Sequence, residues 1–125
     1  MPYTHQWEKK GVYRKYTGNI TGEEIISAMN VVESDARFVE IRYVINDFLE
    51  TKIIDIDSAT INMMAALDKA AALTNPYIKI AILTSDNSMH QLADQYRNKF
   101  SAPPYPTCIF TDLGDARRWI ERDPD

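Results

Sequence analysis

The chain has 125 residues, enough for one domain but not for two of ordinary size. Hydrophobic residues make up 45% of it and charged residues 26%, which is a globular composition and not a disordered one. The net charge of −4 leaves no broad basic surface for phosphate groups, so we expect neither nucleic acid nor an anionic membrane surface as a partner.

Two short strands joined by a tight turn are predicted at the start of the chain. Tyr3–Glu8 and Val12–Tyr16 are rich in aromatic and β-branched residues, and the Lys-Lys-Gly sequence between them suits a hairpin turn. A helix follows, because Thr21 and Glu24 have the spacing of a capping box. Apolar residues then recur at helical intervals up to Ser34-Asp35, where we expect this helix to end.

A long strand and a long helix are predicted in the middle of the chain. Residues Phe38–Phe48 alternate and then become continuously apolar, as in a strand that enters a buried sheet, and residues 49–54 form a connection of undefined shape. The helix runs from Asp57 or Ser58 to Leu73 and is stopped by an Asn-Pro pair. Its apolar stripe is expected to consist of four residues at helical spacing: Ala59, Met63, Leu67 and Ala70.

The last third of the chain repeats the alternation of strand and helix. Ile78–Leu83 predicts a short strand, and a proline-rich loop later precedes another strand at Thr107–Thr111. Each strand is followed by apolar residues at helical intervals, in the first case Met89, Leu92, Ala93, Tyr96 and Phe100, in the second Leu113, Ala116, Trp119 and Ile120.

The order of these elements predicts the fold class. Strands that alternate with helices need crossover connections, which make a sheet mostly parallel and cover it with helices. The leading hairpin adds an antiparallel strand at one edge. We therefore predict a single domain over residues 1–125, a small α/β sandwich with a mostly parallel five-stranded sheet, an antiparallel N-terminal edge strand and four helices.

Acidic and hydroxyl residues follow the predicted strands, where ligands bind in open α/β sheets. Such carboxylates could hold a hard cation, or they could cap the helices that begin there. Capping is the ordinary role of these residue types before a helix, so we expect no bound metal. The residues concerned are Asp47, Asp86 and Asp112 at strand ends, with Asp55, Asp57 and Ser58 before the second helix.

The triplet Asp55-Ile56-Asp57 is similar to the aspartate nucleophile motif of haloacid-dehalogenase-type phosphatases. That motif needs a buried strand before it and a hydroxyl residue two places after the second aspartate, where this chain has Ala59. Too little chain follows to supply the other motifs of those enzymes. An aspartate-based phosphohydrolase is therefore the last of our functional hypotheses, and we expect no catalytic residue.

Other chemistry is excluded by what the sequence lacks. His5 and His90 are far apart, and no second cysteine or histidine stands at zinc-ligand spacing, so neither a metal nor a cofactor is expected. Cys108 is the single cysteine, which excludes an intramolecular disulfide and suits a reducing compartment. No run approaches the roughly 18 apolar residues of a membrane span. We expect a cytoplasmic protein without an integral membrane segment.

Four aromatic residues in the leading hairpin have two interpretations. They either cover the sheet or form an exposed edge that pairs with a second subunit. A homodimer is therefore one of two alternatives. These residues are Tyr3, Trp7, Tyr13 and Tyr16.

The element order and several segments resemble the SpoIIAA-like family, relatives of the STAS domains of anti-sigma-factor antagonists. The segments are the strand IRYVINDF, the helix rich in Ala and Met, IKIAILTSD, and the end IFTDLGDARRWI. The resemblance covers almost the whole chain. It implies a non-enzymatic regulatory module that binds another protein.

The resemblance also implies a switch site. STAS antagonists carry a phosphorylatable serine at the N-terminus of the helix after the third strand, in an Asp-Ser-Ser-Gly-like sequence. The matching place here is Asp57-Ser58-Ala59, which keeps the aspartate and one serine and lacks the second serine and the glycine. Ser58 is thus the candidate phospho-acceptor of a degenerate switch, with Asp47, Asp55, Asp57 and Asp86 as the candidate polar cluster around it.

The family is similar in fold to the lipid-exchange domains of the Sec14 kind, which implies a second non-catalytic hypothesis. The chain would then be a carrier or sensor of a small apolar or amphipathic ligand. Methionine adapts to irregular ligands, so the candidate pocket residues are Met63, Met64 and Leu67. The alternative for these residues is ordinary packing of the helix on its own sheet.

Overall fold

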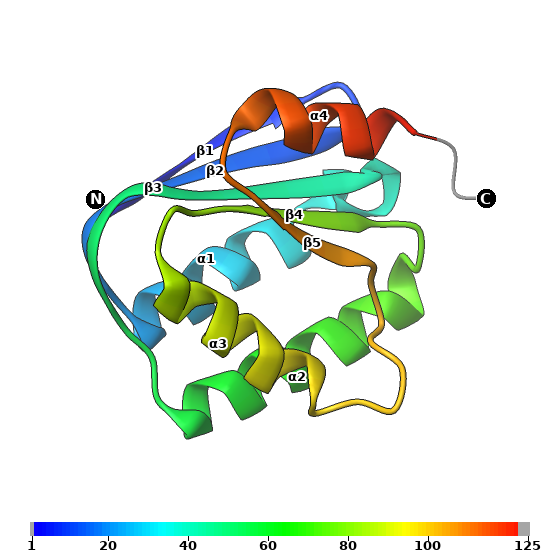
Figure 1. Ribbon diagram of the computed structural model, residues 1–125. Helices are drawn as coiled ribbons and strands as arrows, with labels where there is room; N and C mark the ends of the chain where they lie inside the picture. The colour runs from blue at the N-terminus through cyan, green and yellow to red at the C-terminus, as the bar shows by residue number, and fades with distance from the viewer. Residues whose placement is uncertain (1, 123–125) are drawn as a thin grey trace.

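The computed structural model describes residues 2–122 (Figure 1). Its elements are, in chain order, β1 (Tyr3–Glu8), β2 (Gly11–Thr21), α1 (Gly22–Glu33), the 3₁₀ helix η1 (Ala36–Glu40), β3 (Tyr43–Asp55), α2 (Ser58–Thr74), β4 (Lys79–Leu83), α3 (Asn87–Arg97), β5 (Thr107–Phe110) and α4 (Leu113–Glu121). The strands form one sheet in the order β1-β2-β3-β4-β5, in which β1 is antiparallel to β2 and all other pairs are parallel. The predicted fold class is confirmed.

The strand order determines where the helices lie. Each parallel strand is added on the same side of the previous one, and parallel crossovers are right-handed, so α1, α2 and α3 must cover the same face of the sheet. Figure 1 shows these three helices below the sheet and α4 above it. None of the helices in residues 2–122 is long and apolar enough to cross a membrane.

The two faces of the sheet have separate cores because side chains alternate along each strand. On the face covered by three helices, Val12 of β2 and Val44 of β3 pack with Val32 of α1. On the opposite face, Ile45 of β3 packs with Ala116 of α4. The hairpin aromatics cover the sheet in the same way: Tyr16 is buried, and Tyr3, Trp7 and Tyr13 pack against the core clusters.

The predicted boundaries of the third strand are wrong. The strand does not begin at Phe38, because Phe38 lies in η1, which Asp35 caps by accepting the backbone N–H of Arg37 at 2.8 Å. Strand β3 also continues through residues 49–54, where the sequence predicts a connection of undefined shape. It does so because β2 is long as well, and the two strands stay paired as far as Thr21 and Asp55.

The second helix has the predicted position but not the predicted stripe. Asp57 is its N-cap and the helix starts at Ser58, as expected. The side that faces the protein carries Ile61, Ala65, Asp68 and Ala71 instead of the predicted four, of which Met63 is 52% exposed. Apolar residues lie on every side of this helix, so periodicity alone could not select the buried side.

Candidate functional site

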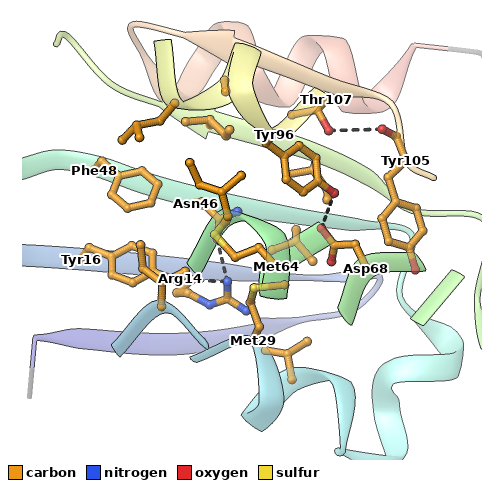
Figure 2. Close-up of a pocket in the computed structure, with 18 of the residues that line it drawn as sticks. Arg14, Tyr16, Met29, Asn46, Phe48, Met64, Asp68, Tyr96, Tyr105 and Thr107 are labelled. Atoms are coloured by element: carbon orange, nitrogen blue, oxygen red, sulfur yellow. Dashed lines mark hydrogen bonds between the residues drawn. The ribbon is translucent and has the colours of Figure 1, made fainter. Parts of the chain in front are cut away.

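A cavity of about 120 Å³ lies between the sheet and the three helices α1, α2 and α3 (Figure 2). Most of its wall is apolar, because each helix turns its buried side toward the same strands. The apolar lining includes Met29 of α1, Ile61 and Met64 of α2, Ile80 and Ile82 of β4, and Met89 and Leu92 of α3. A mostly apolar space of this size suits a small organic molecule.

The guanidinium group of Arg14 lies in the wall of this cavity. Arg14 stands on β2 between the inward-facing Val12 and Tyr16, and it is only 4% exposed. Its Nη1 donates to Asn46 Oδ1 on β3 at 2.8 Å, its Nε to His5 Nε2 on β1 at 3.0 Å, and its Nη2 to the Ala28 carbonyl on α1 at 3.3 Å. Figure 2 shows the side chain reaching toward the methionines of α1 and α2.

Carboxyl groups form another polar part of the cavity wall. Asp68 of α2 is 8% exposed and accepts a hydrogen bond from the Tyr96 hydroxyl of α3. Burial raises the pKa of Asp68 to about 6, although the Tyr96 hydrogen bond and the charge of Arg14 both act to lower it. Burial and the nearby Asp68 raise the pKa of Glu33 on α1 to about 7. Both carboxyl groups therefore take up protons unusually easily.

The predicted pocket residues lie in different places. Met64 lines the cavity. Leu67 packs against the hydrophobic cluster of β2, α1 and α3 and is not in the cavity wall. Met63 is exposed and borders a surface groove that runs along α1 and the first turns of α2, together with Val31 and Thr60.

The four candidate aspartates of the polar cluster are not brought together. Asp47 is buried on the α4 face of the sheet, where it accepts hydrogen bonds from the Tyr13 hydroxyl and from the Leu49 backbone N–H. Asp57 and Asp86 each accept a backbone N–H of the helix they cap, at 2.8 and 2.9 Å, and Asp55 is exposed at the end of β3. No three His, Cys, Asp or Glu side chains in residues 2–122 could hold a metal ion. The phosphohydrolase hypothesis therefore gains no support.

The candidate phospho-acceptor lies on the surface. Ser58 is exposed at the first position of α2, directly after the capping Asp57. Asp57 also borders the groove between α1 and α2, whose other wall includes Gly22 and Val31. The groove surface defined by Gly22, Val31, Asp57, Thr60 and Met63 is thus adjacent to Ser58.

Sequence reasoning missed the polar residues of the cavity. Arg14 has a signal in the sequence, because it shares the inward side of its strand with Val12 and Tyr16 while Tyr13 and Lys15 take the other side. Asp68 has one too, since it lies seven residues after Ile61 on the buried side of α2. Charged residues are almost never fully buried, so residue type alone assigns both positions to the surface.

Three solved structures are similar to the chain over most of their length. One is an uncharacterised protein of the DUF3478 family with a SpoIIAA-like fold from Shewanella loihica, with a TM-score of 0.61 at 15% identity, covering 94% of this chain and 91% of that chain. The second is the anti-sigma factor antagonist SpoIIAA in its unphosphorylated form, with a TM-score of 0.60 at 10% identity, covering 96% and 99%. The third is the Bacillus cell fate determinant SpoIIAA in its phosphorylated form, with a TM-score of 0.58 at 9% identity, covering 94% and 98%.

No protein-family model and no curated sequence matches the chain. At 9 to 15% identity, the structural similarity establishes the fold and leaves the activity open. The chain has the SpoIIAA-like fold that its sequence predicted.

Proposed function

We propose that the chain is a non-enzymatic regulatory module that binds another protein through the groove surface beside Ser58. The observation that carries the proposal is the exposed position of Ser58 at the first residue of α2, next to a groove with the exposed apolar side chains Val31 and Met63. The likeness to SpoIIAA, described as an anti-sigma factor antagonist with a phosphorylated form, supports it.

A phosphate on Ser58 would change this surface strongly. The N-terminus of a helix favours negative charge, but the backbone N–H of Thr60 is already bonded to the carboxylate of Asp57. The added charge of about −2 would therefore meet a like charge beside the groove and extend into solvent. A partner that packs against Val31 and Met63 would be repelled or reoriented, which is the behaviour of a switch.

Site-specific photo-crosslinking in the native host tests the binding surface. A photoreactive residue in place of Met63 should form an adduct with one partner protein, and adding Ser58→Glu should weaken that adduct. The matched control carries the same residue in place of Arg118, which is exposed on α4 at the other face of the sheet. Equal adducts at both positions, or none at Met63, would contradict the proposal.

The phosphorylation step has its own measurement. The mass of the protein purified gently from its host should exceed the chain mass by about 80 Da under denaturing conditions if Ser58 carries a phosphate. Fragmentation should place that mass on Ser58, and Ser58→Ala should remove it. An unmodified mass under all growth conditions would leave a binding module without a switch.

A second candidate function rests on a different observation, the mostly apolar cavity beneath α2. In this function the chain is a carrier or sensor of a small apolar or amphipathic molecule. A mass that is present under native conditions and lost on denaturation would support it. A cavity variant such as Ala93→Leu, which fills space on the α3 side, should lose that extra mass without changing the crosslink at Met63.

A further inference from the structure

Arg14 is a buried cation without a direct counterion. An arginine side chain stays charged at any ordinary pH, and taking a charge out of water is costly unless an opposite charge pairs with it. None of the ion pairs found in residues 2–122 includes Arg14. Its hydrogen-bond partners are a histidine nitrogen, an amide oxygen, a hydroxyl and a backbone carbonyl, and all of these are neutral.

His5 cannot serve as a counterion, and it must be uncharged here. Its Nε2 accepts a hydrogen bond from Arg14 Nε, which requires the neutral imidazole. Burial and the charge of Arg14 both lower the pKa of His5, which agrees with that form.

The guanidinium group also has hydrogen-bonding capacity left. It carries five N–H groups, and the four hydrogen bonds of Arg14 use at most four of them. One of these, from Nη1 to the Tyr16 hydroxyl, is long at 3.5 Å, and the one from Nη2 to the Ala28 carbonyl is 3.3 Å. A planar fork of this kind is suited to donating two parallel hydrogen bonds to a carboxylate.

Two carboxyl groups of the protein face the same cavity, but neither pairs with Arg14. Asp68 is held by the Tyr96 hydroxyl, and neither Asp68 nor Glu33 lies within 4.0 Å of the guanidinium group in the described residues. Burial raises the pKa of Glu33 to about 7, so near neutral pH this group carries only part of its charge, whereas Asp68 is engaged by Tyr96. In the part of the chain that the structure describes, the guanidinium group of Arg14 therefore has no carboxylate in direct contact with it.

The volume of the cavity limits the size of its occupant. An apolar protein cavity of about 150 Å³ holds one benzene molecule, which has six carbon atoms. A cavity of about 120 Å³ thus suits a compact molecule of a similar atom count, and it is too small for a long acyl chain. Its mostly apolar wall of methionine, isoleucine and leucine side chains suits a hydrocarbon body.

We propose that the cavity binds a small organic monocarboxylate with a compact apolar body, whose carboxylate pairs with Arg14 while its hydrocarbon part contacts Met29, Met64 and Met89. This inference rests on the second candidate function, binding of a small molecule in the cavity. It adds the chemical class of the ligand and the residue that selects it. Pairing with Arg14 supplies the missing counter-charge and uses the free N–H capacity.

A comparison of a matched acid and amide tests the inference. The probes are 3-methylbutanoate and 3-methylbutanamide, which have the same size and differ in charge. They are titrated at pH 7.5 into protein labelled with ¹⁵N, and the Nε–H resonance of Arg14 is followed together with the backbone signals of Met64 and Met89. We expect the acid to move these resonances with a dissociation constant in roughly the micromolar to millimolar range. The amide should bind at least about tenfold more weakly.

Two variants locate the effect. Arg14→Met, which has a similar shape and no charge, should bring the acid-to-amide ratio close to one. Ala93→Leu leaves Arg14 in place and should weaken both probes by filling the cavity. If Arg14→Met does not fold, the Arg14 Nε–H resonance and the acid-to-amide ratio of the unmodified protein still decide the question.

Each negative result has a distinct meaning. Equal binding of acid and amide would overturn the role of Arg14 and leave a cavity that binds small apolar molecules. Binding of neither probe up to about 10 mM would overturn both the inference and the carrier function. An acid that binds well without moving the Arg14 resonance would place its site elsewhere and would also overturn the inference.

Discussion

The hydroxyl of Tyr96 on α3 donates a hydrogen bond to the buried carboxyl group of Asp68 on α2. Burial has the larger effect on the pKa of Asp68 and raises it to about 6, although this hydrogen bond acts to lower the pKa. The unfolded chain releases the same proton near pH 4, the usual value of an aspartate. Between these two pH values the native state therefore holds a proton that the unfolded state has lost.

This difference predicts a pH-dependent stability. Protons that are bound more tightly in the native state make the free energy of unfolding fall as the pH rises from about 4 to about 6. The loss from Asp68 should be on the order of 2 to 3 kcal/mol. Urea denaturation of the unmodified protein and of Asp68→Asn at pH 4.5 and pH 7 measures it, together with the smaller change that the loss of the Asp68 charge causes in the pKa of Glu33. Asp94→Asn, an exposed aspartate of α3, is the matched control, and an equal slope in all three proteins would contradict the prediction.

The N-terminal hairpin and the last helix are joined by an ion pair. Arg117 of α4 donates from Nη1 to Glu8 Oε1 at 3.0 Å and from Nη2 to Glu8 Oε2 at 2.8 Å, and the Tyr43 hydroxyl also donates to Glu8. The Arg117 side chain is 38% exposed, so solvent screens the pair, and we expect a coupling free energy of about 1 kcal/mol.

A double-mutant cycle with Glu8→Gln and Arg117→Gln measures this coupling by urea denaturation. The neighbouring pair Asp115–Arg118 on the same helix is the control, because its side chains are 51% and 72% exposed. Its coupling should be below about 0.5 kcal/mol. Equal coupling in the two cycles would show that the bidentate contact between β1 and α4 adds no stability beyond that of an exposed ion pair.

The close approach of α1 and α2 depends on a glycine. A Cβ atom at Gly22 would overlap with Thr60 Oγ1 and lie 2.8 Å from Thr60 Cγ2. Gly22→Ala should therefore lower the free energy of unfolding by about 1 to 3 kcal/mol, the usual cost of overpacking. Thr60→Ala removes both clashing atoms, so the double variant should recover most of the loss.

The control for this glycine lies in α4. A Cβ at Gly114 would meet nothing closer than 3.3 Å, and the nearest atom belongs to the Asp112 side chain. Gly114→Ala should be neutral or slightly stabilising, because alanine favours a helix more than glycine does. Thermal unfolding of the unmodified protein and of these variants measures the effect. If Gly22→Ala is as stable as the unmodified protein, α1 and α2 can move apart without cost and the prediction is wrong.

Asn75 joins the end of α2 to the segment before β3. Its side-chain amide donates to the carbonyls of Phe38 at 2.8 Å and Ile41 at 2.9 Å, and its Oδ1 accepts the backbone N–H of Tyr77 at 3.0 Å. Asn75 is 2% exposed, so Asn75→Ala leaves buried carbonyls without a donor. We expect a loss of about 2 to 4 kcal/mol in the free energy of unfolding.

Thr74→Ala, one residue earlier and exposed at the end of α2, is the control for Asn75. It should change the stability by less than about 0.5 kcal/mol. Hydrogen exchange adds a local measurement, since Asn75→Ala should speed exchange in residues 36–41 before it does so in α4. Equally faster exchange in residues 36–41 and in α4 would mean that Asn75 stabilises the whole fold and not the η1 segment in particular.

Features with a local cause were predictable from the sequence. The capping box of Thr21 and Glu24 forms as expected, with the Thr21 N–H donating to Glu24 Oε1 at 2.9 Å and the Glu24 N–H donating to Thr21 Oγ1 at 3.3 Å. The alternation of strands and helices likewise predicted the mostly parallel sheet, which the structure confirms. The cytoplasmic location and the homodimer stay predictions.

Features with a distant cause were not predictable. Phe38 has a strand-like neighbourhood, but Asn75, 37 residues later, holds its carbonyl in η1. The cavity depends on how three helices pack on one sheet, and its size cannot be derived from periodicity. Residue type favours Met63, Met64 and Leu67 as pocket residues, but of these three only Met64 lies in the cavity wall.

The sheet also separates the two tryptophans of the chain. Trp7 packs against the core of the face that holds the cavity, with the Arg37 guanidinium 3.9 Å from its ring centroid, and Trp119 packs under α4 beside Phe110. Each indole thus has its own optical environment. Variants with one tryptophan, Trp7→Phe and Trp119→Phe, give two fluorescence signals in which the helix-covered side and the α4 side can be followed independently within the same molecule.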